Sequence, residues 1–367
     1  MTDRALSVDD GGDGTDVVAQ AAPPGFEVVA CPGCGGTCST PVRQGKDWVL
    51  RTAQQLTIRR CDGCGLHFLN PRPRMDQIGR YYPEDYHSYQ MRGGDDAGGT
   101  GAAVSGGIRS LALREAFGAP HLRPRGAQRA LARAALALNG AQSFGFGVPW
   151  HGQGRLLDFG CGGGKFLRRM HALGWDVAGI DFSETSVRAV REAGLRVIQG
   201  TLPHPELPPA SFDVVTMRHA LEHVPDPQAV LRAARELLAP GGRLVIQVPN
   251  YNAWEVAYFG DAAVGLDLPR HLTHFTPPTL AAMLERAGFR PIRVRSRARP
   301  SWIRKAAKLA SIRGVRQEGA DVLRRSSLAC RIIGKLHDSR NRGSEILAIA
   351  ERGDDGENGF TSSPMAR

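Results

Sequence analysis

Residues 155–182 read RLLDFGCGGGKFLRRMHALGWDVAGIDF, in the order strand, glycine turn, helix and second strand. Gly160, Gly162 and Gly164 have no Cβ and allow a backbone to approach a ligand closely. Asp181 ends the second strand, where a carboxylate can accept both hydroxyls of a ribose. The stretch therefore predicts a nucleoside-binding edge on a parallel sheet.

The glycine spacing separates two classes of nucleoside. A dinucleotide fingerprint, G-x-G-x-x-G, would need its third glycine at position 165 or 167, where the chain has Lys165 and Leu167. The pattern is instead D-x-G-x-G-x-G, beginning at Asp158. An acid at this position suits a ligand whose near end carries an ammonium group.

This pattern resembles motif I of the class I S-adenosylmethionine (SAM) dependent methyltransferases. The resemblance implies that Asp158 lies near the methionine amine of SAM and that Asp181 lies on its ribose. The family usually has Gly-Asp after the third strand, whereas this chain has Gly200-Thr201-Leu202, so adenine recognition is expected from Thr201 or from backbone groups. The resemblance implies these cofactor-binding residues: Asp158, Gly160, Cys161, Gly162, Gly164, Asp181, Phe182, Thr201, Leu202 and His219.

Strands and helices alternate through the following 90 residues or so. Further strands are expected at 195–199, 211–216 and 243–248, and helices at 184–193 and 227–238. Alternation at this spacing predicts an α/β fold with a doubly wound, mostly parallel sheet, whose ligands bind at the carboxyl ends of the strands. The resemblance implies seven strands in a Rossmann-like methyltransferase domain over 150–352.

Later segments resemble further motifs of the same methyltransferases in the same order. They are 211–215 (SFDVV), 221–227 (LEHVPDP) and 238–246 (LAPGGRLVI). The resemblance covers roughly residues 150–300 and resumes at 344–351, the expected last strand. Several ordered motifs identify the family more specifically than one glycine turn does.

Four cysteines form two C-x-x-C-G turns in the N-terminal part of the chain. Cys31, Cys34, Cys61 and Cys64 have the spacing of a tetrahedral Zn²⁺ site that joins two hairpins, with strand pieces expected at 48–50 and 56–59. Four thiolates would leave no open coordination position, so the metal is expected to be structural. A redox role would need one such motif at a helix start in a thioredoxin-like unit.

The whole layout is similar to a bacterial zinc-binding methyltransferase group and to the C-methyltransferases of nucleotide-linked deoxysugars. The resemblance extends to 66–73 (LHFLNPRP) and to the aromatic segment that begins at Tyr81. His271 matches a histidine of the sugar enzymes, but Arg270 stands where their glutamate would be. The enolate-forming arrangement of C-methylation is therefore in doubt, and the third, C-terminal domain of those enzymes is not expected.

Three histidines are expected near the carboxyl ends of the strands: His219, His223 and His271. Transfer from the activated sulfonium methyl needs mainly in-line placement of the acceptor. A hydroxyl or carbon acid also needs a general base, for which histidine is suited. The alternative is that each histidine only fixes its loop. For Arg270 two roles are open: binding an anionic substrate group, or pairing with Asp267.

The chain has 367 residues and a formal net charge of +11, and residues 301–342 carry eleven Lys and Arg. This basic, partly apolar segment is expected to be a helical insertion that caps the substrate pocket. A peripheral contact with an anionic membrane is the alternative. No signal peptide and no apolar run long enough to span a membrane are seen, so the protein is expected in the cytoplasm.

The remaining segments complete the expected organisation. It comprises a disordered tail at 1–26, a zinc-ribbon-like module with an aromatic segment at 27–90, a flexible linker at 91–107, a helical region at 108–140 and a second disordered tail at 353–367. The aromatic segment either covers the active site or straps the module to the main domain.

The sequence therefore predicts a SAM-dependent methyltransferase that acts on a small-molecule, sugar, glycan or lipid-linked acceptor. The alternatives are a protein that binds or modifies nucleic acid through its zinc module and basic surface, and a pseudoenzyme. Binding to RNA that weakens steeply with salt would indicate the first alternative. The acceptor, the methylated atom and the oligomeric state are not predicted.

Overall fold

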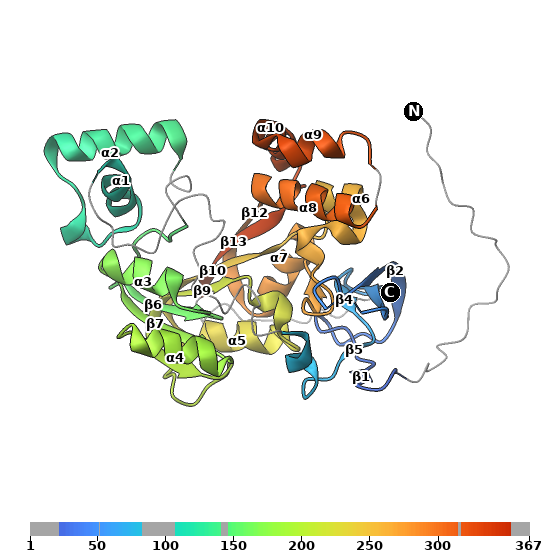
Figure 1. Ribbon diagram of the computed structural model, residues 1–367. Helices are drawn as coiled ribbons and strands as arrows, with labels where there is room; N and C mark the ends of the chain where they lie inside the picture. Colours follow the sequence, from blue (N-terminus) through green and yellow to red (C-terminus); the bar gives the residue numbers. More distant parts are fainter. Residues whose placement is uncertain (1–21, 51, 83–106, 141–145, 315–316, 354–367) are drawn as a thin grey trace, which may run out of the picture.

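The computed structural model describes residues 22–50, 52–82, 107–140, 146–314 and 317–353 (Figure 1). The tails predicted at 1–26 and 353–367 and the linker predicted at 91–107 lie almost entirely outside these residues. Most of the aromatic segment after Tyr82 also lies outside them.

A seven-stranded sheet forms the centre of the molecule, in the strand order β12-β13-β10-β9-β6-β7-β8. Neighbouring strands from β10 to β8 are parallel, whereas β13 runs antiparallel to both β10 and β12. The predicted fold class, a doubly wound and mostly parallel seven-stranded sheet, is confirmed. The strands are β6 (Arg155–Phe159), β7 (Asp176–Asp181), β8 (Arg196–Gln199), β9 (Phe212–Arg218), β10 (Leu238–Pro249), β12 (Phe289–Arg297) and β13 (Glu345–Arg352).

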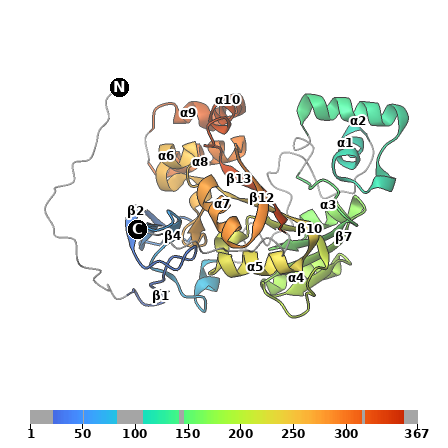
Figure 2. The same ribbon diagram turned by 180° about the vertical axis from the view of Figure 1, so that it is seen from behind.

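Helices cover both faces of this sheet (Figures 1 and 2). Successive side chains of a strand point to opposite faces, so Leu156 and Leu157 of β6 belong to two different cores. One core contains apolar side chains of α3 and α4, and the other contains those of α5 and α7. These helices are α3 (Lys165–Ala172), α4 (Glu184–Glu192), α5 (Pro227–Leu237) and α7 (Pro277–Arg286).

The N-terminal module is a small antiparallel sheet of order β11-β4-β3-β2. Its edge strand β11 comes from the main domain, about 200 residues further along the chain, so the two parts share one sheet. The strand expected at 48–50 was wrong, because these residues form a turn, whereas 56–59 lie in β3. The strands are β1 (Phe26–Glu27), β2 (Ser39–Lys46), β3 (Gln55–Cys61), β4 (His67–Leu69), β5 (Arg72–Pro73) and β11 (Thr273–His274); β1 pairs with β5.

Two helices precede the main sheet, α1 (Ile108–Phe117) and α2 (Gly126–Asn139), with the 3₁₀ turn η2 (Pro120–Leu122) between them. Phe117 of α1 packs in the core on the α3 side, and the indole N–H of Trp175 donates to its carbonyl at 2.8 Å. α2 buries only Ala132 and lies on α1 (Figure 1). The first helix therefore belongs to the main domain, and the second covers the first.

Residues 300–338 form the helical insertion between β12 and β13. Its helices α8 (Pro300–Ile312), α9 (Ala320–Arg325) and α10 (Ser327–Asp338) pack on α6 (Trp254–Phe259) around a separate small core. The 3₁₀ turns η5 (Gly260–Ala262) and η6 (Val264–Leu266) join α6 to the segment that leads to β11. The insertion thus lies over the segments that follow β10.

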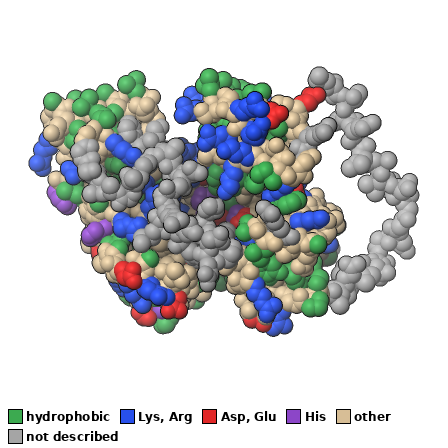
Figure 3. Space-filling view, viewed as in Figure 1, with side chains coloured by type: hydrophobic (Ala, Val, Ile, Leu, Met, Phe, Trp, Pro, Cys, Tyr) green, Lys and Arg blue, Asp and Glu red, His purple; other side chains and the backbone are tan. Residues whose placement is uncertain are grey.

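The outer side of the insertion is both basic and apolar. Leu328, Ile332 and Leu336 are one helical turn apart on α10 and are 64, 53 and 58% exposed. Figure 3 shows Lys and Arg side chains gathered over the region of α8 to α10. Among the described residues, no helix has the length and apolar character needed to cross a membrane.

Candidate functional site

The glycine turn after β6 folds against the end of β7. Gly160, Gly162 and Gly164 have φ angles of 70°, 49° and 73°, a conformation that favours glycine. The Asp181 carboxylate accepts hydrogen bonds from the N–H groups of Gly162 at 2.8 Å and of Ser183 at 2.9 Å. An ionised carboxylate has about four lone-pair sites, so Asp181 keeps acceptor capacity for two ribose hydroxyls.

Asp158 lies at the end of β6, beside this turn. It is 2% exposed, and the Thr216 hydroxyl donates to its carboxylate at 2.6 Å. Burial raises the pKa of Asp158 to about 7; Asp181 acts in the same direction, while Arg218 and Thr216 oppose it. The two predicted carboxylates are thus brought close enough to interact, and a cationic group placed here would favour the ionised form of Asp158.

Asp158, Asp181 and the glycine turn form one side of the candidate SAM-binding crevice. The loop after β8 and the residue after β7 lie next to them. The Gly200 N–H donates to the backbone carbonyl of Asp181 at 2.9 Å, which holds the loop next to the carboxylate. Phe182 is 58% exposed and Thr201 is exposed, whereas Leu202 is 3% exposed and packs in the core. Phe182 and Thr201 are therefore accessible to a ligand, whereas Leu202 anchors the loop by packing in the core.

Arg218 is a candidate cofactor residue that the sequence reasoning did not identify. It ends β9, and its guanidinium lies 4.5 Å from the ring centroid of Phe146 and 4.8 Å from that of Phe166. Its charge lowers the pKa of Asp158, so the two side chains lie close together. A guanidinium suits the carboxylate of an amino-acid ligand. Its position directly before His219, at a strand end, was the only available signal.

The three predicted histidines meet around one buried carboxylate, Glu222. Its Oε1 lies 3.6 Å from Nδ1 of His219 and 3.9 Å from Nε2 of His271, and His223 is within 4.8 Å. Neither oxygen of Glu222 has a hydrogen-bond partner among the described residues, although the side chain is 1% exposed. Burial acts to raise the pKa of Glu222, but the histidines lower it below its ordinary value.

His271 is held in one orientation by the backbone. Its Nδ1 lies 3.0 Å from the carbonyl oxygen of Gly265, an acceptor only, so Nδ1 carries the proton and donates. In the neutral ring the lone pair is then on Nε2, which lies 3.9 Å from Glu222 and 4.0 Å from Asp267. An imidazole in this state can take up a proton, and two carboxylates would stabilise the resulting cation.

His223 sits between the aromatic segment and the main domain. It belongs to the 3₁₀ turn η4 (Leu221–His223), and its Nδ1 lies 3.0 Å from both the Tyr82 hydroxyl and the Arg270 carbonyl oxygen. Burial, followed by the effect of His271, lowers the pKa of His223 to about 4, so it is neutral at pH 7. Tyr82 follows η1 (Ile78–Tyr81), and its contact places this part of the aromatic segment against the site.

His219 faces a second buried carboxylate that the sequence reasoning did not identify. Its Nε2 lies 3.7 Å from Glu345 of β13, which is itself paired with Arg299 at 2.6 Å. The ring centroid of Trp302, from the insertion, lies 5.5 Å from that of His219. The insertion therefore contributes an aromatic side chain to the site, as a cap would.

The glycine turn and the histidine cluster are neighbours. A Cβ built on Gly160 would lie 2.5 Å from Cβ of Ala220, the residue between His219 and η4. The strand ends of β6 and β9 are adjacent, with Asp158 opposite Thr216. A molecule in the crevice at Asp158 and Asp181 would therefore lie beside the histidines.

Of the two roles left open for Arg270, the structure favours pairing with Asp267 over binding of a substrate anion. Its side chain is 1% exposed and pairs with Asp47 at 3.0 Å and with Asp267 at 2.9 Å. The guanidinium also donates to the carbonyl oxygens of Tyr81 and Leu268. The same arginine joins the N-terminal module to the main domain.

Glu222, His223 and His271 also meet the donor requirement of a divalent cation. Each offers one ligand atom, and these atoms all lie within 4.8 Å of one another. Histidine metal ligands commonly donate their other ring N–H to a carbonyl, as His271 does to Gly265. The cluster can thus serve as a proton acceptor or as a metal site.

The four predicted zinc ligands lie together in the N-terminal module. The Sγ atoms of Cys31 and Cys64 are 3.5 Å apart and those of Cys34 and Cys61 are 3.6 Å apart, and all four lie within 4.8 Å of one another. A tetrahedron with Zn–S bonds of about 2.3 Å has edges of about 3.8 Å, so the sulfurs fit this ion. Burial raises the pKa of Cys61, but N–H donors and neighbouring thiols lower it to about 7.

The two cysteine turns have the same backbone design. The N–H of Gly35 donates to the carbonyl of Cys31 at 2.8 Å, and that of Gly65 donates to Cys61 at 2.9 Å. Both glycines have positive φ, 75° and 73°. Cys38 is exposed and outside the cluster. Such paired turns are typical of zinc knuckles.

Cys161 and Cys330 are both buried and lie apart from the zinc cluster. A Cβ built on Gly179 would lie 2.7 Å from Sγ of Cys161, so this side chain packs against β7. Sγ of Cys330 donates to the carbonyl of Leu323 inside the insertion. Burial raises the pKa of both thiols, which makes neither a good nucleophile.

Comparisons with known proteins agree with the methyltransferase fold of this chain. The family model described as a methyltransferase domain matches residues 120–294. A ubiquinone biosynthesis O-methyltransferase of Xanthomonas euvesicatoria is 36% identical over 170 residues, which are 43% of this chain and 71% of that protein. The enzyme of the same name from Bordetella avium is 39% identical over 150 residues, 37% of this chain and 62% of that protein.

Among solved structures, a SAM-dependent methyltransferase of Mesorhizobium loti is similar with a TM-score of 0.39 and 24% identity, over 56% of this chain and 94% of that one. The chain spans 71% of the length of the Xanthomonas relative and 62% of that of the Bordetella relative. The match to a relative over most of its length agrees with the motif order and with the seven-stranded sheet. The chain belongs to the class I SAM-dependent methyltransferases.

Proposed function

We propose that the protein transfers a methyl group from SAM to a hydroxyl of a small molecule. The observation that carries this proposal is the geometry of His271: its Nδ1 lies against the Gly265 carbonyl oxygen, and its Nε2, the ring nitrogen that then carries the lone pair in the neutral form, faces Glu222 and Asp267. A hydroxyl must lose its proton when it attacks the methyl carbon. The names of the relatives, O-methyltransferases of ubiquinone biosynthesis, support an oxygen acceptor.

The chain's own groups supply the steps of this reaction. Asp181 would accept hydrogen bonds from the ribose hydroxyls of SAM, Asp158 would bind its ammonium group, and Arg218 would pair with its carboxylate. Bound SAM would supply an activated methyl group, and His271 would take the proton that the acceptor hydroxyl loses when it is methylated. Glu222 and Asp267 stabilise the imidazolium that forms. Trp302 and Tyr82 cover the site and exclude water.

The class of the methylated atom is tested with SAM that carries a ¹³C-labelled methyl group. Purified enzyme is incubated with labelled SAM and fractionated small molecules from the host cell, and the product is examined by NMR. The carbon chemical shift separates O-, N- and C-methyl groups. We expect an O-methyl signal that depends on enzyme. An N- or C-methyl product would contradict the hydroxyl acceptor and leave the assignment as a methyltransferase intact.

A divalent cation at Glu222, His223 and His271 is the second candidate for activating the acceptor. The observation that favours it is the buried carboxylate of Glu222, whose two oxygens have no partner among the described residues. A bound cation would lower the pKa of a coordinated hydroxyl. Dialysis against a chelator, under conditions that leave the zinc content constant, separates the candidates: His271 acting alone predicts unchanged activity, and the metal predicts its loss.

The N-terminal module is proposed to hold structural Zn²⁺ through Cys31, Cys34, Cys61 and Cys64. Replacing Cys61 with serine should reduce zinc from one ion per chain to well below half, because three thiolates complete the tetrahedron poorly. Zinc is measured by mass spectrometry of the purified protein. Cys38→Ser is the matched control, with full zinc expected. Full zinc in the Cys61 variant would show that another group completes the site.

A further inference from the structure

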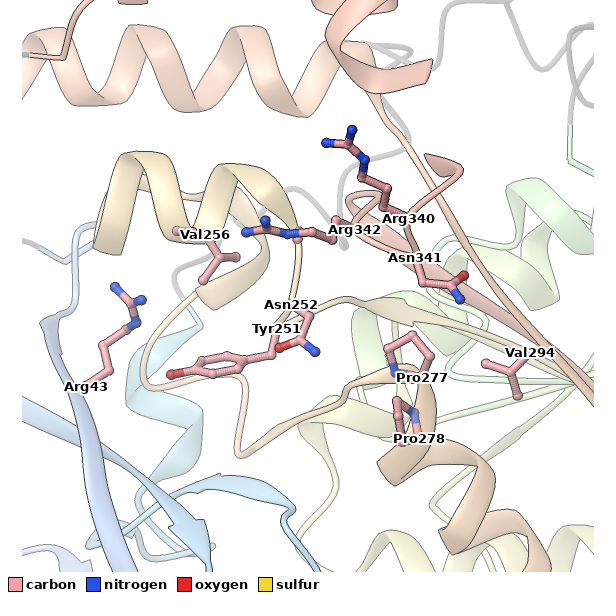
Figure 4. Close-up of a pocket in the computed structure, with 12 residues that line it drawn as sticks. Arg43, Tyr251, Asn252, Val256, Pro277, Pro278, Val294, Arg340, Asn341 and Arg342 are labelled. Atoms are coloured by element: carbon pink, nitrogen blue, oxygen red, sulfur yellow. The ribbon is translucent and has the colours of Figure 1, made fainter. Parts of the chain in front are cut away.

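A pocket lies where the N-terminal module, the segment after β10 and the segment before β13 meet (Figure 4). Its volume is about 710 Å³. Arg43 comes from β2 of the module, Tyr251 follows β10, and Arg340 and Arg342 follow α10. None of the cofactor candidates lines this pocket, so it is distinct from the SAM crevice.

The side chains that line the pocket carry positive charge. Three of its lining residues are arginines, and the described residues that line it include no Asp or Glu. The Nε–H of Arg43 is buried and has no hydrogen-bond partner among the described residues. A buried donor without a partner destabilises the protein, and a charged donor does so more strongly. An oxyanion in the pocket would satisfy this donor and reduce the repulsion between the guanidinium groups.

The rest of the pocket is suited to a ring or another apolar group. Tyr251 is stacked on His67, with ring centroids 4.2 Å apart and an angle of 29° between the planes, and this contact fixes its position. The guanidinium of Arg43 lies 6.0 Å from the Tyr251 centroid. Pro277 and Pro278 line the side opposite Arg340 and Arg342 (Figure 4). A ligand with both an anionic and an apolar part matches these walls.

We propose that this pocket binds the phosphate group of a phosphate ester. Arg43, Arg340 and Arg342 bind its oxygens, and Tyr251 packs against the organic part. Arginine is suited to this role because its planar fork donates two parallel hydrogen bonds to a phosphate. Such a ligand would connect the N-terminal module to the segment before β13. The ester is either a soluble metabolite or a phospholipid headgroup.

The proposal is tested by calorimetry on the zinc-loaded full chain, with phenyl phosphate and inorganic pyrophosphate as soluble probes. We expect saturable binding with one site per chain. Arg43→Gln and Arg342→Gln should each weaken it about tenfold or more, because each removes a charge-assisted hydrogen bond. Vesicles containing phosphatidic acid form the second arm: binding to vesicles that needs Arg43 and Arg342, with no binding of the soluble probes, assigns the headgroup as the source.

Arg331→Gln is the matched control, because Arg331 is exposed on α10 and does not line the pocket. It should bind both probes like the wild type, and zinc content and melting temperature verify that each variant is folded. The proposal is overturned by absence of binding in both arms. It is equally overturned if Arg331→Gln weakens binding as much as the pocket variants do, which would indicate only general attraction to a basic surface.

Discussion

Replacing His271 with asparagine should lower kcat by about 10²- to 10⁴-fold, the usual contribution of a general base. Asparagine keeps an N–H that can donate to the Gly265 carbonyl, so the loop should hold its position, whereas the lone pair beside Glu222 and Asp267 is lost. SAM affinity should stay within about threefold of wild type, because His271 lies outside the cofactor crevice. The measurement is single-turnover transfer from labelled SAM at saturating acceptor.

His171→Asn is the control for this experiment, since His171 is exposed on α3 and away from the site. Its kcat should equal that of the wild type. A kcat of His271→Asn within tenfold of wild type would remove the histidine from the proton transfer. Glu222 and His223 would then have to be examined as the acceptor-activating groups.

Replacing Arg270 with methionine should reduce the free energy of unfolding by about 3–5 kcal/mol, the cost of breaking a buried ion pair. The side chain is 1% exposed, and its removal leaves Asp47 in the module and Asp267 in the main domain without their shared cation. Because this pair joins the two parts, the module should also become more sensitive to protease. Denaturant unfolding of the zinc-loaded protein measures the first effect, and limited proteolysis measures the second.

Arg74→Met is the matched control, because Arg74 also pairs with an aspartate, Asp76, but both side chains are more than half exposed. Its effect on the free energy of unfolding should be much smaller, because an exposed ion pair is screened by solvent and contributes little to stability. If Arg270→Met and Arg74→Met have similar small effects, the buried pair does not hold the module in place.

The sequence predicted those parts of the site whose conformation depends on a few consecutive residues. The turn from Asp158 to Gly164 needs positive φ angles at its glycines, and this requirement is visible in the sequence. The same holds for the two cysteine turns, where Gly35 and Gly65 follow the second cysteine of each pair. The fold class followed from the regular alternation of strands and helices.

Contacts between distant segments were not visible in the sequence. The ion pair of Asp47 with Arg270 joins residues 223 positions apart, so the sequence left the role of the arginine open between anion binding and pairing with Asp267. Glu345 follows the insertion and is far from His219 in the sequence, but strand β13 places its carboxylate next to the imidazole of His219. No strand was predicted at the position of β11, because its partner β4 lies in the N-terminal module. Glu222 stood directly before His223, but only the fold shows that three histidines surround it.

The central claim is that Asp158 and Asp181 bind the two ends of SAM in one crevice. Isothermal titration of SAM tests it most directly, with wild type, Asp181→Asn and the control Asp176→Asn at the exposed start of the same strand. We expect saturable binding to wild type and control, and binding weaker by more than about tenfold in Asp181→Asn, because a hydrogen-bonded charge is lost. Absence of binding to folded wild type, or equal affinity of all three proteins, would contradict the account.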